Sequence, residues 1–191
     1  MATELKDYIK IYDAAISRPE CLEIIKAFDR GIEHQQFIDS DKRPSFTQLN
    51  ITQRYKAQQD PFVGIQEKLQ KVFVDYVSMY MRQLDVAADF PDKYAFEEFR
   101  IKKYNPNYDE FRDHVDVGDY NSARRFLVGF IYLNDVPEGA GGETDFPKLG
   151  LKVRPIAGRM LIFPPTWQYR HAGRMVLSGK KYILGSYLHY L

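Results

Sequence analysis

The sequence predicts an α+β fold, in which helices from the first half of the chain back a β-sandwich or jelly roll from the second half. Apolar residues recur at helical spacing up to about residue 85, and short strand-like runs separated by turn-rich segments follow. The 14 Tyr and 13 Phe also favour strands. At 191 residues the chain is long enough for one domain with its own core. We expect a single domain over 1–191, with mainly helical support in 1–94 and the β-sheet core in 95–191.

Two helices are predicted in the first half. Ser17 and Glu20 have the spacing of a capping box, and the helix that they open ends near Gly31. The dipeptide Asp60-Pro61 opens a longer helix with one apolar face that continues to Leu84. We interpret this face as packing surface. A further strand is predicted at 46–51.

Four strands are predicted in the second half, at 97–104, 125–133, 158–163 and 182–189. The run at 125–133 is almost continuously apolar, which is typical of a strand that is buried on both faces. Segments rich in Gly, Pro and Asn separate the runs. This arrangement favours a sandwich or jelly roll.

Composition excludes several functional classes. The 27 basic and 26 acidic residues give a net charge of +1. The basic residues do not form an obvious cluster, so nucleic-acid binding is not expected. The single cysteine, Cys21, cannot form an intramolecular disulfide and fits a reducing, cytoplasmic setting. Neither a secretory leader nor an apolar stretch long enough to cross a bilayer is expected.

Three residues have the chemistry of a metal site. His114 and Asp116 are separated by one residue, so on an extended segment both side chains point the same way. His171 lies just before the last predicted strand. Two histidines and one carboxylate form the facial triad of non-haem Fe(II) oxygenases. Zinc accepts the same ligands, and a surface His–Asp hydrogen bond is the non-metal alternative.

Further motifs flank these residues in a fixed order, and with them the sequence resembles the prolyl 4-hydroxylase-like branch of the Fe(II)/2-oxoglutarate oxygenases. The resemblance covers roughly residues 95–191. Its motifs are Tyr104, His114-Val115-Asp116, Tyr132-Leu133-Asn134, the GGETDFP segment at 141–147, the PIAG turn at 155–158, His171 and Gly179-Lys180-Lys181.

The resemblance implies a double-stranded β-helix, a form of jelly roll, with the N-terminal helices packed on one sheet. It also implies that His114, Asp116 and His171 bind Fe(II), and that 2-oxoglutarate and O₂ are cosubstrates. Succinate and CO₂ would be co-products, and ascorbate is an expected cofactor. Halogenating relatives lack the carboxylate of the triad, so the presence of Asp116 favours hydroxylation.

The distal carboxylate of 2-oxoglutarate would need a buried cation, because an unpaired buried charge is costly. Lys181 matches the family position, whereas Lys180 points to the opposite face of the strand. Alternation alone does not choose between them, but the spacing from His171 and Gly179 favours Lys181. Tyr132 or Tyr104 would add a hydrogen bond to the same carboxylate. The alternative for both tyrosines is core packing with a satisfied hydroxyl.

The expected substrate is a prolyl residue within a peptide or protein that exposes it. A free amino acid or other small molecule is the first alternative, and a non-catalytic metal-binding jelly-roll module is the second. Aromatic residues can line a groove for an extended, polyproline-like peptide, and an arginine can hold a carbonyl or a carboxylate. Strand packing is the alternative for the aromatic residues, and 117–124 resembles a mobile lid. The candidates are Trp167, Tyr108, Tyr120 and Tyr169 for the groove and Arg100 and Arg125 for the arginine.

Overall fold

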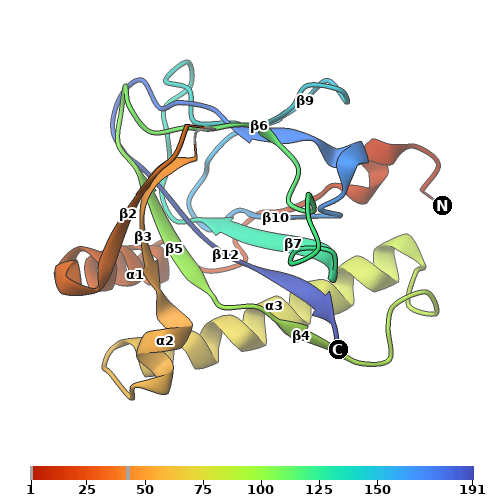
Figure 1. Cartoon of the computed structure of the whole chain (residues 1–191), viewed down its shortest axis with the longest axis horizontal. Coiled ribbons are helices and arrows are strands. Elements are labelled where there is room, and N and C mark those ends of the chain that lie inside the picture. The colour runs from red at the N-terminus through yellow and green to blue at the C-terminus, as the bar shows by residue number, and fades with distance from the viewer. Residues whose placement is uncertain (1, 42–43) are drawn as a thin grey trace.

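The computed structural model describes residues 2–41 and 44–191 as two facing antiparallel sheets with helices packed on the outer side of the larger one (Figure 1). The α-helices are α1 (Arg18–Arg30), α2 (Ile51–Lys56) and α3 (Phe62–Leu84). The 3₁₀ helices are η1 (Leu5–Tyr8), η2 (Ile32–His34) and η3 (Trp167–Tyr169). The strands are β1 (Lys10–Tyr12), β2 (Gln35–Asp39), β3 (Ser45–Asn50), β4 (Tyr94–Phe96), β5 (Arg100–Tyr104), β6 (Phe111–His114), β7 (Arg125–Tyr132), β8 (Thr144–Phe146), β9 (Leu151–Val153), β10 (Met160–Phe163), β11 (His171–Gly173) and β12 (Lys181–Tyr190).

The larger sheet has the order β1-β10-β7-β12-β5-β3-β2, and β4 pairs with β12 beside this path. The smaller sheet has the order β6-β11-β8-β9. In Figure 1, α1 and α3 lie on one side of the larger sheet and the smaller sheet lies on the other. The α+β class and the jelly-roll arrangement with helices against one sheet are therefore confirmed.

Local sequence signals explain where the helices begin and end. The backbone N–H of Glu20 donates to Ser17 Oγ over 3.4 Å and the N–H of Ser17 donates to Glu20 Oε2 over 2.7 Å, so α1 has the predicted capping box. Gly31 caps its C-terminus. Helix α3 begins at Phe62, and Pro61 occupies its N-cap and not its first turn, which corrects the predicted start by one residue. No helix within 2–41 and 44–191 combines the length and apolarity needed to cross a bilayer.

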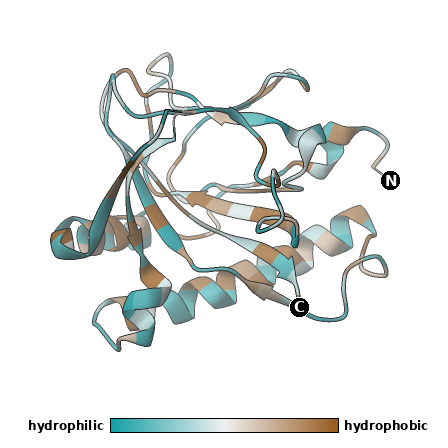
Figure 2. Cartoon of the chain, viewed as in Figure 1, coloured by the Kyte–Doolittle hydropathy of each residue, from teal (hydrophilic) through white to brown (hydrophobic). Residues whose placement is uncertain are grey.

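One row of apolar residues ties the larger sheet to the helices. Residues in register across β1, β10, β7, β12, β5 and β3 all belong to the core that contains the buried faces of α1 and α3. They are Tyr12, Met160, Ile131, Leu184, Ile101 and Leu49. Figure 2 shows both hydrophobic and hydrophilic residues along β5, where Arg100 and Lys102 flank the buried Ile101, so the other face of this strand carries polar side chains.

The structure confirms the long predicted strands and adds short ones. Strand β5 begins at Arg100 and β10 begins at Met160, each later than predicted. Gly158 has a φ of +81° and belongs to a turn, which explains the later start of β10. Strand β6, which carries the first histidine of the triad, was not predicted.

Candidate metal centre

The three predicted metal ligands come together between the two sheets. His114 ends β6 and His171 begins β11, and the two residues are direct partners in the pairing of these strands. The loop after β6 brings Asp116 to them, because the N–H of Asp116 donates to the carbonyl of Pro165 over 3.1 Å. One ligand atom from each side chain lies within 4.8 Å of the others. The described chain therefore contains a His-Asp-His site.

Backbone carbonyls orient both imidazoles. Nδ1 of His114 lies 2.7 Å from the carbonyl oxygen of Arg112, and Nδ1 of His171 lies 3.0 Å from that of Tyr169. A carbonyl only accepts, so each Nδ1 carries a proton, and Nε2 is the ring nitrogen that each histidine presents to Asp116. The Nε2 atoms of His114 and His171 lie 3.5 and 3.7 Å from the two oxygens of Asp116. This is the tautomer that metal ligation requires.

Asp116 is buried and only half satisfied. Its Oδ1 accepts a 2.9 Å hydrogen bond from the Tyr187 hydroxyl, whereas its Oδ2 has no hydrogen-bond partner among the described residues. Burial alone would raise the pKa of Asp116, but the neighbouring His171, His114 and Tyr187 outweigh it and hold the pKa well below its usual range. A buried anionic oxygen without a hydrogen-bond partner, beside the Nε2 atoms of two imidazoles, fits a divalent cation.

Tyr187 is a site residue that sequence reasoning missed. It lies on β12, and its ring also stacks beneath the Arg125 guanidinium at 3.9 Å from the ring centroid. A strand tyrosine carries no signal of its own, since the contact with Asp116 depends on how β12 faces the loop after β6.

Lys181 occupies the inner end of the cavity. It is 2% exposed, its Nζ donates to the carbonyl of Gly142 over 3.0 Å, and it lies 4.4 Å from the centroid of the Tyr104 ring. Burial lowers the pKa of Lys181 to about 7, and the nearby Glu143 partly offsets this. Lys180 is exposed. Of the two lysines, Lys181 is thus the one that faces the cavity.

The two candidate tyrosines differ in position. Tyr104 lines the cavity, and its hydroxyl makes no hydrogen bond within the described residues. Tyr132 does not line it, and its hydroxyl donates to Thr144 Oγ1 over 2.6 Å. Burial raises the pKa of both phenols, so both stay neutral donors. Thr144 itself lines the cavity and holds Tyr132 behind it.

The cavity at the triad has an inner and an outer part. The inner part, of about 60 Å³, reaches Lys181 and Tyr104, and the outer part, of about 310 Å³, reaches Pro44, Phe46 and Gln48 on the β3 side. Both parts are lined by Lys102, Phe111, His114, Asp116 and Tyr187.

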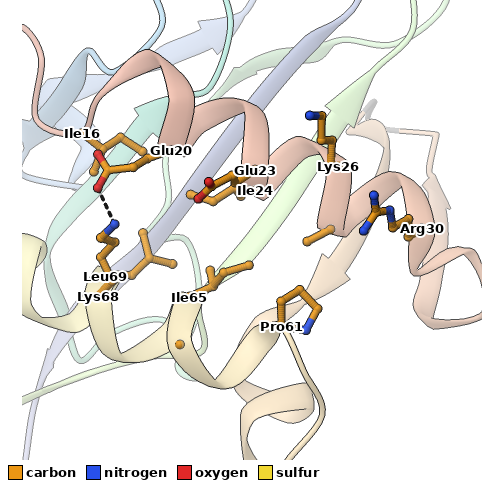
Figure 3. Close-up of a pocket in the computed structure, with 12 residues that line it drawn as sticks. Ile16, Glu20, Glu23, Ile24, Lys26, Arg30, Pro61, Ile65, Lys68 and Leu69 are labelled. Carbon is orange, nitrogen blue, oxygen red and sulfur yellow. Dashed lines mark ion pairs between the residues drawn. The ribbon is translucent and has the colours of Figure 1, made fainter.

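A larger cavity, of about 500 Å³, lies away from the triad between α1 and α3. Figure 3 shows its apolar floor, including Ile16, Ile24 and Ile65, and charged residues at its rim. None of the three candidate ligands lines it. It is a groove between packed helices on the side of the sheet opposite the metal site.

The candidate substrate residues fall into two groups. Trp167 is 71% exposed in η3, directly after the turn whose Pro165 carbonyl holds Asp116, and Arg100 lines the outer cavity while paired with Glu98. Arg125 also lines the outer cavity, clamps Glu97 at 2.7 and 2.9 Å and donates to the Asp116 carbonyl over 3.1 Å.

The remaining candidates lie elsewhere. The Tyr108 hydroxyl donates to Asp39 over 2.6 Å, and Tyr108 lines neither part of the cavity. Tyr169 is 5% exposed and packs in a core cluster, so it is a packing residue. Tyr120 is 93% exposed on the loop 117–124, which Ser122 and Asp119 tie together by hydrogen bonds. The mobility of this loop stays a prediction.

Known proteins match both the sequence and the fold. A family model for the 2OG-Fe(II) oxygenase superfamily matches residues 99–189. The viral collagen prolyl hydroxylase of Paramecium bursaria Chlorella virus-1, in complex with 2OG, is 24% identical with a TM-score of 0.69, and the match covers 96% of each chain. A Pseudomonas putida prolyl-4-hydroxylase is 15% identical with a TM-score of 0.69, over 96% of this chain and 93% of the other.

A third match is the Trichoplax adhaerens prolyl hydroxylase in complex with a hypoxia inducible factor oxygen degradation domain peptide fragment. It is 13% identical with a TM-score of 0.73, over 95% of this chain and 83% of the other. No curated protein sequence matches significantly. Residues 99–189 thus form a 2OG-Fe(II) oxygenase domain, and the chain is a 2-oxoglutarate-dependent dioxygenase with the fold of the prolyl hydroxylases.

Proposed function

We propose that the enzyme hydroxylates a prolyl residue in a peptide or protein and forms succinate and CO₂ as co-products. The observation that carries the proposal is the position of the His-Asp-His site. It lies in a cavity whose outer part opens between the two sheets, and the exposed Trp167 follows the turn that holds Asp116. Three proteins of the same fold are named prolyl hydroxylases, and one of them holds a peptide fragment.

In this proposal His114, Asp116 and His171 bind Fe(II), with O₂ as the oxidant and ascorbate as an auxiliary reductant. The metal, when bound, supplies the redox chemistry that couples oxidation of 2-oxoglutarate to hydroxylation. The chain contributes geometry. Carbonyl acceptors fix the two imidazoles, and the Tyr187 hydroxyl fixes one oxygen of Asp116 and leaves the other for the metal.

Lys181 and Tyr104 bind the distal carboxylate of 2-oxoglutarate. The Lys181 ammonium is already held by the Gly142 carbonyl and the Tyr104 ring, so little rotamer freedom remains to be lost on binding. Gly142 has a φ of +79°, which a glycine adopts without strain and which turns its carbonyl toward Lys181. Tyr132 acts one step further away, through its hydrogen bond to Thr144.

Trp167 contacts the peptide. A prolyl segment is preformed and presents a flat ring face, and an exposed indole next to the site can stack on it. Trp167, like Tyr108, lines neither part of the cavity, but Trp167 follows the turn whose Pro165 carbonyl holds Asp116, whereas the Tyr108 hydroxyl donates to Asp39. A reducing, cytoplasmic setting is part of the proposal, because the single cysteine, Cys21, is buried and free.

The test is a screen of proline-containing peptides with Fe(II), 2-oxoglutarate and ascorbate. A true substrate raises succinate formation above the uncoupled rate and gains one oxygen atom, which fragmentation mass spectrometry places on proline. The same peptide with alanine in place of proline should gain none. Trp167→Ala should raise the KM for the peptide and leave 2-oxoglutarate affinity nearly unchanged, whereas Tyr190→Ala, at the far end of β12, should change neither. Efficient oxidation of free proline or another small acid, with no reaction on any peptide, would establish a small-molecule hydroxylase instead.

A further inference from the structure

A second lysine faces the cavity beside the metal site. Lys102 lies in the middle of β5, between Arg100 and Tyr104 on the cavity face, and opposite Ile183 of β12 and Gln48 of β3. It lines both the inner and the outer part of the cavity. Its neighbours in sequence, Ile101 and Lys103, point to the helix side of the sheet.

Lys102 has no counterion among the described residues. The two arginines at the same mouth are already paired, Arg100 with Glu98 and Arg125 with Glu97. The Lys102 Nζ lies over the rings of Phe46 and Phe111, whose centroids lie 4.7 and 5.8 Å away. A half-buried ammonium on aromatic faces keeps part of its stabilisation, but it lacks the anion that such groups normally find.

Burial lowers the pKa of Lys102 to about 8, and Asp116 partly offsets the effect. Asp116 lies beyond ion-pair distance and is itself a candidate metal ligand, so its charge is committed elsewhere. Lys102 therefore lacks an anionic partner among the described residues.

A charge balance of the loaded site shows which anion is missing. The positive charges of Fe(II) and Lys181 are matched by Asp116 and the two carboxylates of 2-oxoglutarate. The ammonium of Lys102 remains as one uncompensated positive charge. One further carboxylate beside the metal would neutralise it.

The position of Lys102 selects the source of that carboxylate. Successive cavity-facing residues of a strand lie about 7 Å apart, so Lys102 is one such step closer to the mouth than Tyr104 and Lys181. Phe46 and Gln48 line the outer part of the cavity and not the inner part. The outer part is therefore the space left for the substrate.

We propose that Lys102 binds a carboxylate of the substrate, so that the enzyme prefers prolyl peptides with an acidic residue adjacent to the target proline. The inference deepens the proposed function and rests on it. It makes Lys102 a residue that determines specificity and adds an anion subsite to the mouth of the metal cavity.

The test is a binding measurement on the whole protein loaded with Mn(II) and saturated with 2-oxoglutarate under nitrogen. Calorimetry compares two peptides that differ only in glutamate or glutamine next to the proline, and a second pair, L-proline and L-prolinamide. The variants are Lys102→Met, which keeps the length of the apolar stem, Lys102→Arg, which keeps the charge, and Lys103→Met as the control on the other face of β5. Thermal unfolding verifies that each variant is folded.

In the wild type and in Lys103→Met, the acidic peptide should bind about tenfold to a hundredfold more tightly than its amide partner, the range expected for a charge-assisted hydrogen bond. Lys102→Met should abolish this preference and Lys102→Arg should retain it. Equal affinity within both pairs in the wild type, including no binding by either acid, would overturn the inference.

A titration with the cosubstrate tests the other possible partner of Lys102, which is a carboxylate of 2-oxoglutarate itself. Titration of 2-oxoglutarate into the Mn(II)-loaded proteins should give nearly the same Kd for Lys102→Met and wild type. A large loss in this titration, with the peptide preference intact, would assign Lys102 to the cosubstrate and overturn the inference. Failure of the proposed function has a different signature, since no proline-containing peptide would then gain oxygen whatever its charge.

Discussion

Two neighbouring rows of residues cross the same strands of the larger sheet and have opposite characters. Leu49, Ile101, Leu184 and Ile131 are in register across β3, β5, β12 and β7, and each is 0% exposed on the helix side. One residue away along each strand, Gln48, Lys102, Ile183 and Tyr132 are in register on the cavity side.

The comparison shows how strand alternation separates stability from chemistry. The helix-side row is uniformly apolar, and its burial against α1 and α3 stabilises the fold. The cavity-side row includes a cation without a counterion, and the next cavity-facing residue of β12 toward the inner end is Lys181. Such groups cost stability and are expected where a ligand supplies the missing partner. Substitutions on the helix side should therefore lower the stability of the fold, and substitutions on the cavity side should lower ligand binding.

The largest expected effect is on the cavity side, at the triad. Asp116→Ala should abolish turnover and Mn(II) binding, because it removes the only carboxylate of the site. It should also lower the melting temperature modestly, because a carboxylate whose pKa is held below its usual range stabilises the fold and because the Tyr187 hydroxyl loses its acceptor. Metal binding by calorimetry and thermal unfolding measure the two properties, with the exposed Asp75→Ala on α3 as control. Normal metal affinity in Asp116→Ala would place the metal elsewhere.

The inner end of the cavity should give the next largest effect. Lys181→Met should weaken 2-oxoglutarate binding to the Mn(II)-loaded protein by about 3–5 kcal/mol, mostly because a buried carboxylate is left unpaired. The exposed Lys180→Met should change it little. Similar, small losses in both variants would mean that another cation binds the distal carboxylate.

On the helix side, Ile101→Ala should lower the free energy of unfolding by about 2–5 kcal/mol, because it opens a cavity in the core. In the folded variant the Kd for 2-oxoglutarate should stay near the wild-type value. Chemical denaturation and calorimetry at the same temperature separate the two quantities. A loss of 2-oxoglutarate affinity as large as that of Lys181→Met would show that the two faces of the sheet are not independent.

The binding of 2-oxoglutarate should depend on pH through Lys181 on the cavity side. The ammonium form of Lys181 binds the carboxylate, and its pKa in the free protein is about 7. Above pH 7 binding must therefore take up a proton, so the affinity should fall by up to about tenfold per pH unit. Lys181→Met should show no such decline between pH 7 and 8.5. A decline of equal slope in that variant would assign the titration to another group.

The sequence predicts those parts that depend on local patterns. The Ser17–Glu20 capping box and the apolar run of β7 appear in the structure, and His114 and Asp116 converge, although Asp116 lies in the loop after β6 and not on an extended strand. The short strands β6, β8 and β11 could not be predicted, because three or four residues carry too little periodicity.

The roles of Lys102 and Tyr187 depend on the register of β5 and β12 with their neighbours. Register is a property of strand pairs, and a single strand does not specify it. Tyr104 and Tyr132 illustrate the same limit. Their sequence patterns are equivalent, but only the packing of Thr144 puts Tyr132 behind the cavity wall and leaves Tyr104 facing it.

The smallest expected effect lies on the helix side, at the rim of the groove between α1 and α3, where Glu20 caps α1 and forms an ion pair with Lys68 (Figure 3). The ion pair with Lys68 and the hydrogen bonds with Ser17 lower the pKa of Glu20 to about 2. A carboxylate whose pKa is lower in the folded state stabilises the fold above its unfolded pKa, and this contribution is lost as the pH falls toward the folded value. Glu20→Gln keeps a side chain able to accept the capping hydrogen bond but removes the charge, so it should cost about 1 kcal/mol or less at pH 7. The difference from wild type should shrink between about pH 4.5 and pH 2, the two values that bound the titration. Urea unfolding at several pH values measures it, with the exposed Glu23→Gln on the same helix as control. A difference that stays constant down to pH 2 would mean that Glu20 acts through packing and not through its charge.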